Sequence, residues 1–464
     1  DTCLSEKDLV NWKYLNRRAL YLHHIATSLK ERFPSYEMHY EWLHDDCDKP
    51  VLVLALPNTV CSCGSRLRIL PVPSESVFPL SKLSLAHNNV HVTVDDALPS
   101  TWFYNSMILE DMLLNHYTQF ILAQAHQVPV LLRAGILFRH WLATANLDPH
   151  VNGFIGTLFL ALLVQQGRLT EAMSPWQAFV VLLDAIGKLD ATQPIHFHTR
   201  ESLHPQELKD ASVFQLLDDS FGYLVSFRIT QASMREVIQR ASRHAEAIRG
   251  VYDPSLINDL FGEPVQQAEQ YDVVLRLKVT NLVKERFYSA NGELNYSQYV
   301  AVQRDVESWT TRALSKRALA VRTQFVTPAS WGVSESCVFP GQLLLFLSLN
   351  PENISRLADR GPQAKSPEVE AWKQLWGSKS ELRRYKDGSI QYTNLWSCKP
   401  GQNYMVPVEI VRYILSLHTL AITELKVLSQ PLADLIPPAV ESPLNETCSQ
   451  LCHVLREEIN ESER

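Results

Sequence analysis

The stretch from residue 370 to 396 holds the side chains of this sequence that are best suited to contact an anion. Between Lys373 and Lys386 five side chains are cationic, and only Glu381 is anionic. The chain as a whole is acidic, with 43 basic and 50 acidic residues and a formal net charge of −7. A local reversal of sign in an acidic chain points to an anionic partner.

Aromatic side chains alternate with these cations. They are Trp372, Trp376, Tyr385, Tyr392 and Trp396. Their flat faces can stack on nucleobases or on guanidinium groups, and their apolar bulk can equally fill a core. We therefore expect a nucleic-acid interface, in which the following cations pair with phosphates: Lys379, Arg383, Arg384 and Lys386. An alternative stays open, in which Arg383 and Arg384 form ion pairs inside their domain and only stabilise it.

The same stretch approaches a metal-dependent phosphoryl-transfer motif without completing it. Gly377-Ser378 followed by Asp387 has the layout of nucleotidyltransferase palm domains, in which a Gly-Ser turn holds phosphate and an Asp-x-Asp strand binds two metals. The residue two positions after Asp387 is Ser389, and Asp387-Gly388 is a strong hairpin signal. Two-metal chemistry needs converging carboxylates, and this stretch offers one. We expect no catalytic residue, metal site or cofactor.

The segment centred on L-R-R-Y-K-D-G-S-I (382–390) closely resembles the Nrap family of nucleolar RNA-associated proteins, components of the small-subunit processome. L-N-R-R-A-L-Y-L-H-H-I (15–25) and Y-N-S-M-I-L-E-D-M-L (104–113) are similar to the same family. The resemblance implies catalytically inactive nucleotidyltransferase-like (palm) domains that alternate with helical domains similar to those of poly(A) polymerases and oligoadenylate synthetases. It also implies a nuclear, nucleolar location, with pre-rRNA and other processome proteins as partners.

The resemblance covers nearly the whole chain in order, so we expect an α+β fold in four segments. Residues 1–104 would be the C-terminal part of a first nucleotidyltransferase-like domain, and 105–265 a helical domain with a β-hairpin. Residues 266–403 would be a second nucleotidyltransferase-like domain, and 404–464 the start of a second helical domain. Asp1 looks like a cut inside a larger protein, so we expect a fragment that lacks the N-terminus, including the first Gly-Ser turn, and the C-terminal part.

Hydrophobic periodicity predicts the elements. Helical spacing indicates one amphipathic helix over 7–33, and Asn105 is the expected N-cap of another. The apolar run 51–56 is typical of a strand buried on both faces. It contains no Asp or Glu, although the corresponding strand of active palms usually supplies a metal carboxylate. Further helices are expected at 129–144, 153–166, 175–187, 233–250 and 408–420, and further strands at 67–73, 223–229, 271–279 and 343–349.

Several connecting segments carry polar side chains. The acids of 216–222 are expected in a turn between two strands. Residues 350–367 are expected to form a mobile acidic loop. Four cations in a stretch without acids have the spacing expected for one side of a helix, and they are Arg312, Lys316, Arg317 and Arg322.

Cysteine and histidine patterns give weak signals. The eight Cys are scattered without a disulfide framework, which favours a reducing compartment. Cys47, Cys61 and Cys63 would bind zinc only with a fourth ligand such as His39 or His44, and the paired C-x₂-C spacing of structural zinc sites is missing. His196, His198 and His204 lie in a polar connector, where a chemical role is not expected. The apolar run 154–164 is shorter than the roughly 18 to 20 residues needed to span a bilayer, so no membrane partner is expected.

The predicted function is a non-catalytic scaffold that acts in pre-rRNA processing and 40S ribosome biogenesis. It would use degenerate nucleotidyltransferase domains to bind RNA and proteins. One alternative is an active RNA terminal nucleotidyltransferase whose metal motif lies upstream of residue 1. Another is a pure protein-interaction subunit whose basic stretches are covered by other chains.

Overall fold

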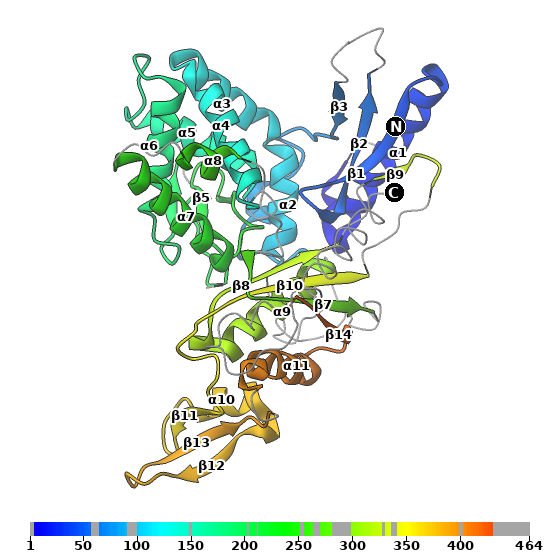
Figure 1. Ribbon diagram of the computed structural model, residues 1–464. Coiled ribbons are helices and arrows are strands. Elements are labelled where there is room, and N and C mark those ends of the chain that lie inside the picture. The colour runs from blue at the N-terminus through cyan, green and yellow to red at the C-terminus, as the bar shows by residue number, and fades with distance from the viewer. Residues whose placement is uncertain are drawn as a thin grey trace. The chain divides into compact units, whose positions relative to one another are not determined.

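The computed structural model divides the chain into two compact units (Figure 1). Unit 1 comprises residues 1–266 and 329–338, and unit 2 comprises 267–328 and 339–464. The structure describes residues 4–56, 65–90, 100–147, 151–201, 204–210, 212–250, 255–262, 270–280, 298–326, 330–335, 341–398 and 402–429. Both units combine helices with sheets, which confirms the α+β class. The division into four domains stays a prediction.

Unit 1 opens with a helix packed on a four-stranded antiparallel sheet. The helix is α1 (Lys13–Arg32), and the sheet has the order β3-β2-β1-β9. Its strands are β1 (Glu37–Leu43), β2 (Asp46–Ala55), β3 (Arg66–Ile69) and β9 (Trp331–Gly332). Leu22 and Ala26 of α1 pack against Leu52 and Leu54 of β2. β9 comes from the connection between two strands of unit 2, and it pairs with β1.

Two predicted boundaries in this part are wrong. The helix expected from residue 7 begins at Lys13, because Asn11 and Trp12 have φ angles of 54° and 57° and interrupt the helical path. The strand expected over 51–56 is confirmed as buried, but it starts at Asp46 and therefore includes two acids, Asp46 and Asp48.

The rest of unit 1 is a helical bundle with a small sheet. The helices are α2 (Trp102–Met112), α3 (Leu114–Gln127), α4 (Val130–Thr144), α5 (Gly153–Gln165), α6 (Pro175–Gly187), α7 (Gln231–Arg249) and α8 (Ser255–Phe261). The sheet holds β4 (Ile195–Phe197), β5 (Leu216–Asp218) and β6 (Tyr223–Leu224). Side chains of Asn152, Ser174 and Thr230 cap α5, α6 and α7 and fix where these predicted helices begin.

Two polar residues of unit 1 have roles that differ from those predicted. Asn105 is not an N-cap, because α2 already starts at Trp102 and Asn105 is fully buried inside it. Its amide donates to the carbonyls of Ser84 and His87 at 2.8 and 3.0 Å and so holds a loop against the helix. Asp218 is not in a turn, because it ends β5 and accepts a hydrogen bond of 2.8 Å from Tyr117 Oη.

Within the described ranges, no single helix has both the length and the apolar character needed to cross a membrane. The pair α3 and α4 meets both requirements only jointly, and the two helices are bent by 116° at their junction.

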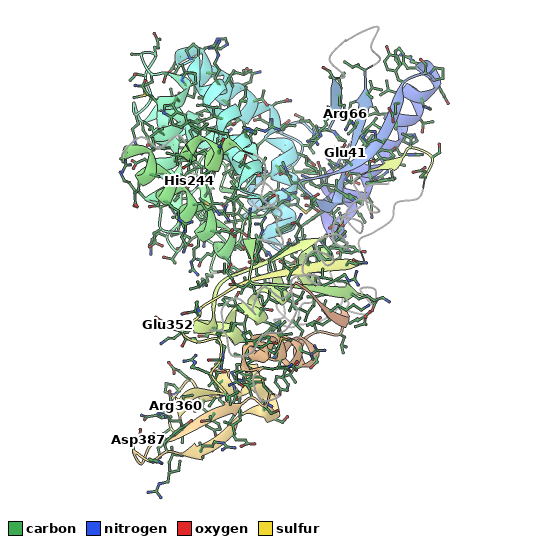
Figure 2. The ribbon with its side chains drawn as sticks, viewed as in Figure 1. Glu41, Arg66, His244, Glu352, Arg360 and Asp387 are labelled. Atoms are coloured by element: carbon green, nitrogen blue, oxygen red, sulfur yellow. The ribbon has the colours of Figure 1, made fainter. Side chains whose placement is uncertain are left out.

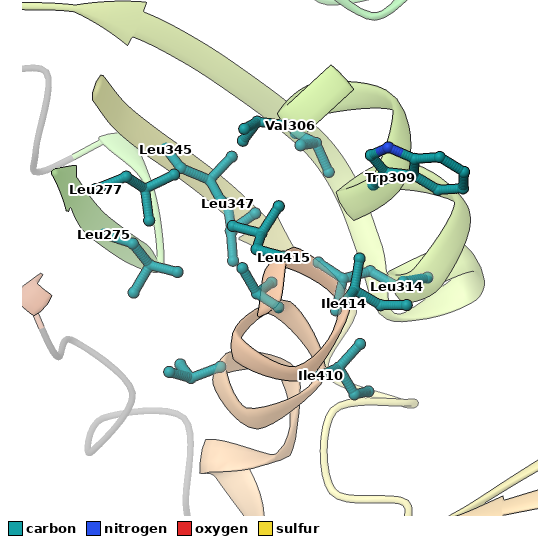
Figure 3. Close-up of a cluster of buried hydrophobic side chains, with 14 of the residues drawn as sticks. Leu275, Leu277, Val306, Trp309, Leu314, Leu345, Leu347, Ile410, Ile414 and Leu415 are labelled. Atoms are coloured by element: carbon teal, nitrogen blue, oxygen red, sulfur yellow. The ribbon is translucent and has the colours of Figure 1, made fainter. Parts of the chain in front are cut away.

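Unit 2 is built on a second four-stranded antiparallel sheet with the order β14-β7-β10-β8. Its strands are β7 (Val273–Val279), β8 (Ala318–Phe325), β10 (Gln342–Leu349) and β14 (Ile422–Ser429), and its helices are α9 (Gln298–Leu314) and α11 (Val406–His418). Figure 3 shows leucines of β7 and β10 meeting Val306 of α9 and Ile414 of α11 in one core. The buried strand predicted over 343–349 is confirmed as β10.

A smaller three-stranded sheet completes unit 2. It has the order β11-β13-β12, with β11 (Ala358–Gln363), β12 (Glu381–Arg384) and β13 (Ile390–Leu395), and α10 (Val369–Trp376) packs beside β11. Residues 350–367 are therefore not a single loop, because β11 lies inside them. Gly361 and Pro362, which interrupt strand propensity, hide this strand in the sequence.

The four cations predicted on one side of a helix do not lie on one helix. α9 ends at Leu314, and Ser315, with a φ of 46°, begins a 3₁₀ turn that reaches Arg317. Arg322 lies on β8. Arg317 and Arg322 are only 1% and 2% exposed, so they serve the interior of unit 2.

Candidate nucleic-acid interface

The C-terminal part of the basic stretch forms the hairpin β12–β13, as its Asp387-Gly388 signal predicted, whereas Lys373 lies on α10. Gly388 has a φ of 82°, and the backbone N–H and hydroxyl of Ser389 donate to Asp387 Oδ1 at 2.9 and 2.7 Å. These two hydrogen bonds hold the pKa of Asp387 below its ordinary value. Asp387, the one acid of the incomplete metal motif, therefore accepts hydrogen bonds within its own turn, at the tip of the small sheet (Figure 2).

One face of this sheet combines cations, a tyrosine and hydrogen-bonding groups. The strand register and the contacts below assign to it Arg360, Glu381, Arg383, Tyr385, Gln391 and Thr393, which we call the Arg360 face. The Arg360 guanidinium carbon lies 4.0 Å from the centroid of the Tyr385 ring. The Tyr385 hydroxyl is 2.7 Å from Thr393 Oγ1, and Arg383 pairs with Glu381 at 2.6 Å on the surface. The pairing with Glu381 offsets one positive charge, and Arg360 forms no ion pair with any of the described residues.

The opposite face carries exposed apolar side chains. Arg384 points to this face, because side chains alternate along a strand, and it lies opposite Ile390. Leu382 and Ile390 are 52% and 46% exposed. Lys373 of α10 lies 5.3 Å from the centroid of the Tyr392 ring, and a hydrogen bond to Tyr392 raises the pKa of Lys373.

The structure therefore divides the four predicted cations. Arg383, Arg384 and Lys386 are exposed, so neither arginine lies in an ion pair inside the unit. Arg383 and Arg384 point to opposite faces of the hairpin. Lys379 lies apart in a 3₁₀ turn, half-buried, with its Nζ 5.0 Å from the centroid of the Trp396 ring. Arg360 was missed in the sequence because its segment was interpreted as a loop.

A pocket of about 630 Å³ opens beside the Arg360 face, between the end of α9, β11 and α10. Four of its lining residues are cationic: Arg312, Lys316, Arg356 and Arg360. Ala371, Trp372, Leu375 and Trp376 of α10 supply an apolar wall. Two acids also line it, Asp359 and Glu368.

Asp359 is already neutralised by a buried partner. Arg317 donates to Asp359 Oδ1 from Nη2 at 2.9 Å and from Nε at 3.2 Å, and Trp396 Nε1 donates to the other carboxylate oxygen at 2.9 Å. The remaining lining charges are four cations against Glu368, so the pocket is electropositive.

One lining residue of the pocket, Trp376, carries an unsatisfied donor that is closed off from the pocket. Trp376 is 2% exposed, and among the described residues its Nε1 has no hydrogen-bond acceptor. A buried donor without an acceptor costs about 1–3 kcal/mol.

The acids near the first sheet are held in a buried network of ion pairs. Arg18 and Lys49 contact the two carboxylate oxygens of Asp111 at 2.9 and 3.0 Å, and Arg228 contacts Asp46 at 2.7 Å and Glu110 at 2.6 Å. Burial alone would raise the pKa of Glu110, but Arg228 and Lys49 hold it far below its ordinary value.

No group of three or more His, Cys, Asp or Glu side chains that could hold a metal occurs in the described parts of the chain. Cys47 is buried, and His39 and His196 contact Glu41 and Asp219 at 3.2 and 2.9 Å. Cys61 and Cys63 lie outside the described residues, so the structure does not test the zinc hypothesis.

Comparison with known proteins identifies the family. Residues 1–127 match Nrap protein domain 1 and residues 267–420 match Nrap protein domain 3, which together span more than half of the chain. Nucleolar protein 6 of Xenopus laevis is 28% identical over 447 residues, covering 89% of this chain and 38% of the relative. Nucleolar protein 6 of Homo sapiens is 25% identical over 443 residues, with coverages of 89% and 38%. U3 small nucleolar RNA-associated protein 22 of Schizosaccharomyces pombe is 27% identical over 448 residues, with coverages of 90% and 40%.

The chain thus spans about two fifths of the length of these curated relatives. One solved chain, from the structure of the E. coli MS115-1 CdnC:HORMA-deltaN complex, covers 53% of this chain and 71% of its own length at 17% identity, with a TM-score of 0.33. That score is too low to support an argument. The names of the relatives confirm the predicted nucleolar localisation. The chain belongs to the Nrap family of nucleolar RNA-associated proteins.

Proposed function

We propose that this chain is part of a non-catalytic scaffold of the small-subunit processome that binds pre-ribosomal RNA in 40S ribosome biogenesis. The names of the relatives, nucleolar protein 6 and U3 small nucleolar RNA-associated protein 22, support a role in ribosome biogenesis. The observation that carries RNA binding is the Arg360 face, where an exposed arginine lies over a tyrosine ring.

This face has the chemistry that single-stranded RNA recognition requires. Unpaired bases stack on tyrosine rings and arginine planes, and phosphates pair with exposed cations. Gln391 is partly exposed and adds a hydrogen-bonding amide on the same face, whereas Thr393 is buried and positions the Tyr385 hydroxyl. Because the whole chain is acidic, the electrostatic contribution to binding must be local to such a face.

The opposite face of the hairpin fits the protein-binding side of a scaffold. It exposes Leu382 and Ile390, and β12 is an edge strand of the small sheet. An edge strand with exposed apolar neighbours can pair with a strand of another protein. A scaffold would then bind RNA on one face and a processome protein on the other.

We further propose that the two four-stranded sheets are degenerate palm domains without catalytic activity. Asp46, Glu110 and Asp111 bind cations of the protein, and Asp387 binds its own turn, so these acids are engaged without a metal. The competing activity is RNA terminal nucleotidyl transfer. We expect the full-length protein with Mg²⁺ to add no labelled nucleotide to an RNA 3′ end, and sustained addition would overturn this proposal.

The RNA-binding proposal is tested by the salt dependence of affinity. We expect Arg360→Gln with Arg383→Gln to weaken binding of a single-stranded RNA and to reduce the slope of log K against log salt by about 1.4, at about 0.7 per lost phosphate contact. The matched control is Arg412→Gln with Lys426→Gln, which removes two exposed cations from α11 and β14 of the same unit. Equal slopes for the two double variants would contradict the proposal.

A further inference from the structure

The pocket between α9, β11 and α10 is large enough to hold a small ligand. Its volume of about 630 Å³ lies inside the range of roughly 300–1,000 Å³ typical of ligand sites. We propose that this pocket holds one unpaired nucleotide of the bound RNA, with its phosphate at the cationic rim and its base against the tryptophan wall. This inference rests on the proposed RNA binding and adds a specific site to it.

The rim has the charges for a phosphate. Arg312 lies in the last turn of α9 and Lys316 in the 3₁₀ turn that follows it, and both are exposed. Arg356 is exposed as well, and its distance of 3.7 Å from Asp359 leaves a weak pair, because Arg317 already holds that carboxylate more closely. The three cations can therefore pair with a phosphate without first leaving a strong partner.

The wall has the chemistry for a base. Trp372 and Trp376 lie one helical turn apart on α10, with ring centroids 5.7 Å from each other. Trp372 is partly exposed, so its ring can stack on a base, whereas the N–H of the buried Trp376 is closed off from the pocket. A purely apolar ligand would leave the cationic rim unpaired, and a purely anionic one would leave the apolar wall empty.

The pocket is continuous with the proposed RNA face. Arg360 lines the pocket, and its guanidinium also lies 4.0 Å from the centroid of the Tyr385 ring. A strand that stacks on Tyr385 can therefore place a neighbouring nucleotide in the pocket. This continuity favours RNA over a phosphorylated peptide as the occupant.

The test uses the full chain with AMP as the smallest probe. We expect AMP to bind wild-type protein, and Lys316→Gln with Arg356→Gln to weaken that binding about tenfold or more, because two charged contacts to phosphate are lost. Arg412→Gln with Lys426→Gln should bind AMP as wild type does. Both changes in the pocket are at exposed positions, so circular dichroism should show an unchanged fold. Equal AMP affinity in the two double variants, or binding of a phosphotyrosine peptide in preference to AMP, would overturn the proposal.

A second experiment distinguishes a failure of the pocket assignment from a failure of the proposed RNA binding. A single-stranded RNA containing 2-aminopurine should lose fluorescence on binding wild-type protein, because the base stacks on tryptophan, and it should displace AMP. With saturating RNA, Arg383→Gln with Lys386→Gln should keep the fluorescence loss, whereas the pocket double variant should lose it. RNA that binds without displacing AMP would overturn the pocket assignment alone, and absence of RNA binding would overturn the proposed function.

Discussion

Cations have different roles in the buried network of unit 1 and in the small sheet of unit 2. In unit 1 Arg18 and Lys49 have side chains that are 1% and 0% exposed, and they neutralise buried acids. In the small sheet of unit 2 Arg383 has a side chain that is 44% exposed, and Arg360 is exposed over a tyrosine ring. The comparison shows that positive residues in this family member cannot be counted as RNA contacts until their burial is known.

The buried network of unit 1 links segments that are distant in sequence. Arg228, which precedes α7, contacts Asp46 of β2 and Glu110 of α2, and the first of these pairs spans 182 residues. Buried ions lose their hydration, so each one is tolerated only while its partners are present. The network therefore ties the first sheet to the helical bundle inside unit 1, and it is sensitive to the loss of any member.

The largest expected effect comes from breaking this network. Arg18→Gln should lower the free energy of unfolding of unit 1 by about 3–5 kcal/mol, because Asp111 keeps a buried charge with one partner fewer. The neighbouring Arg17→Gln is the matched control. Arg17 is 47% exposed and pairs with Asp8 at 3.3 Å, so its loss should cost about 0–1 kcal/mol. Urea denaturation followed by circular dichroism measures both, and similar losses would contradict the distinction between buried and exposed cations.

The next effect tests the packing that shapes the pocket of unit 2. A Cβ atom at Gly361 of β11 would lie 2.4 Å from the Trp372 ring, so Gly361→Ala should destabilise unit 2 by about 1–3 kcal/mol. It should also weaken AMP binding, because Trp372 lines the pocket. Gly341→Ala is the control, since nothing lies within 4 Å of its added Cβ atom. The midpoints of thermal unfolding of the two variants measure this difference in stability. Equal midpoints would show that β11 and α10 are less closely packed than described.

Local sequence patterns predicted those elements whose signal is local. The apolar runs form β2 and β10, and Asp387-Gly388 forms the hairpin turn, as predicted. These predictions succeed because hydrophobic periodicity and turn preferences depend on only a few neighbouring residues. The family resemblance extended these predictions to the order of the whole chain.

Partners that are far apart in sequence could not be predicted in this way. Asn105 is equally suited to cap a helix and to bind a loop, and only the tertiary fold chooses the second role. The prediction that the cations from Arg312 to Arg322 share one helix face was wrong, because the helix ends just before Ser315, inside the pattern. The pocket was missed for the same reason, since its residues come from three separate segments.

A smaller effect concerns pH and a histidine in the bundle of unit 1, labelled in Figure 2. Burial lowers the pKa of His244, aided by Arg240 and Arg243, and Trp141 Nε1 donates to His244 Nδ1 at 2.8 Å. Below about pH 6.5 the unfolded chain binds a proton that the folded chain does not, so stability falls as the pH falls. The loss is limited to about 1.4 kcal/mol per pH unit for one proton.

The measurement compares wild type with His244→Gln between pH 7.5 and 5. The stability difference between the two proteins should shrink as the pH falls, because the variant has no proton to bind. His126→Gln, which removes an exposed histidine from α3, should keep the wild-type pH dependence. A constant difference for His244→Gln would mean that this histidine does not contribute to the pH dependence of unit 1.

The smallest expected effect on stability comes from removing the exposed hairpin cations Arg383 and Arg384. Arg383→Gln with Arg384→Gln should change the free energy of unfolding of unit 2 by no more than about 0.5 kcal/mol, because both side chains are exposed and the one pair they form, with Glu381, is at the surface. The same variant should bind RNA more weakly. A cation that can be removed without loss of stability is free to serve a ligand, whereas Arg18 is not. Should the double variant instead unfold as readily as Arg18→Gln, the hairpin cations would be structural, and RNA binding would have to be sought elsewhere in unit 2.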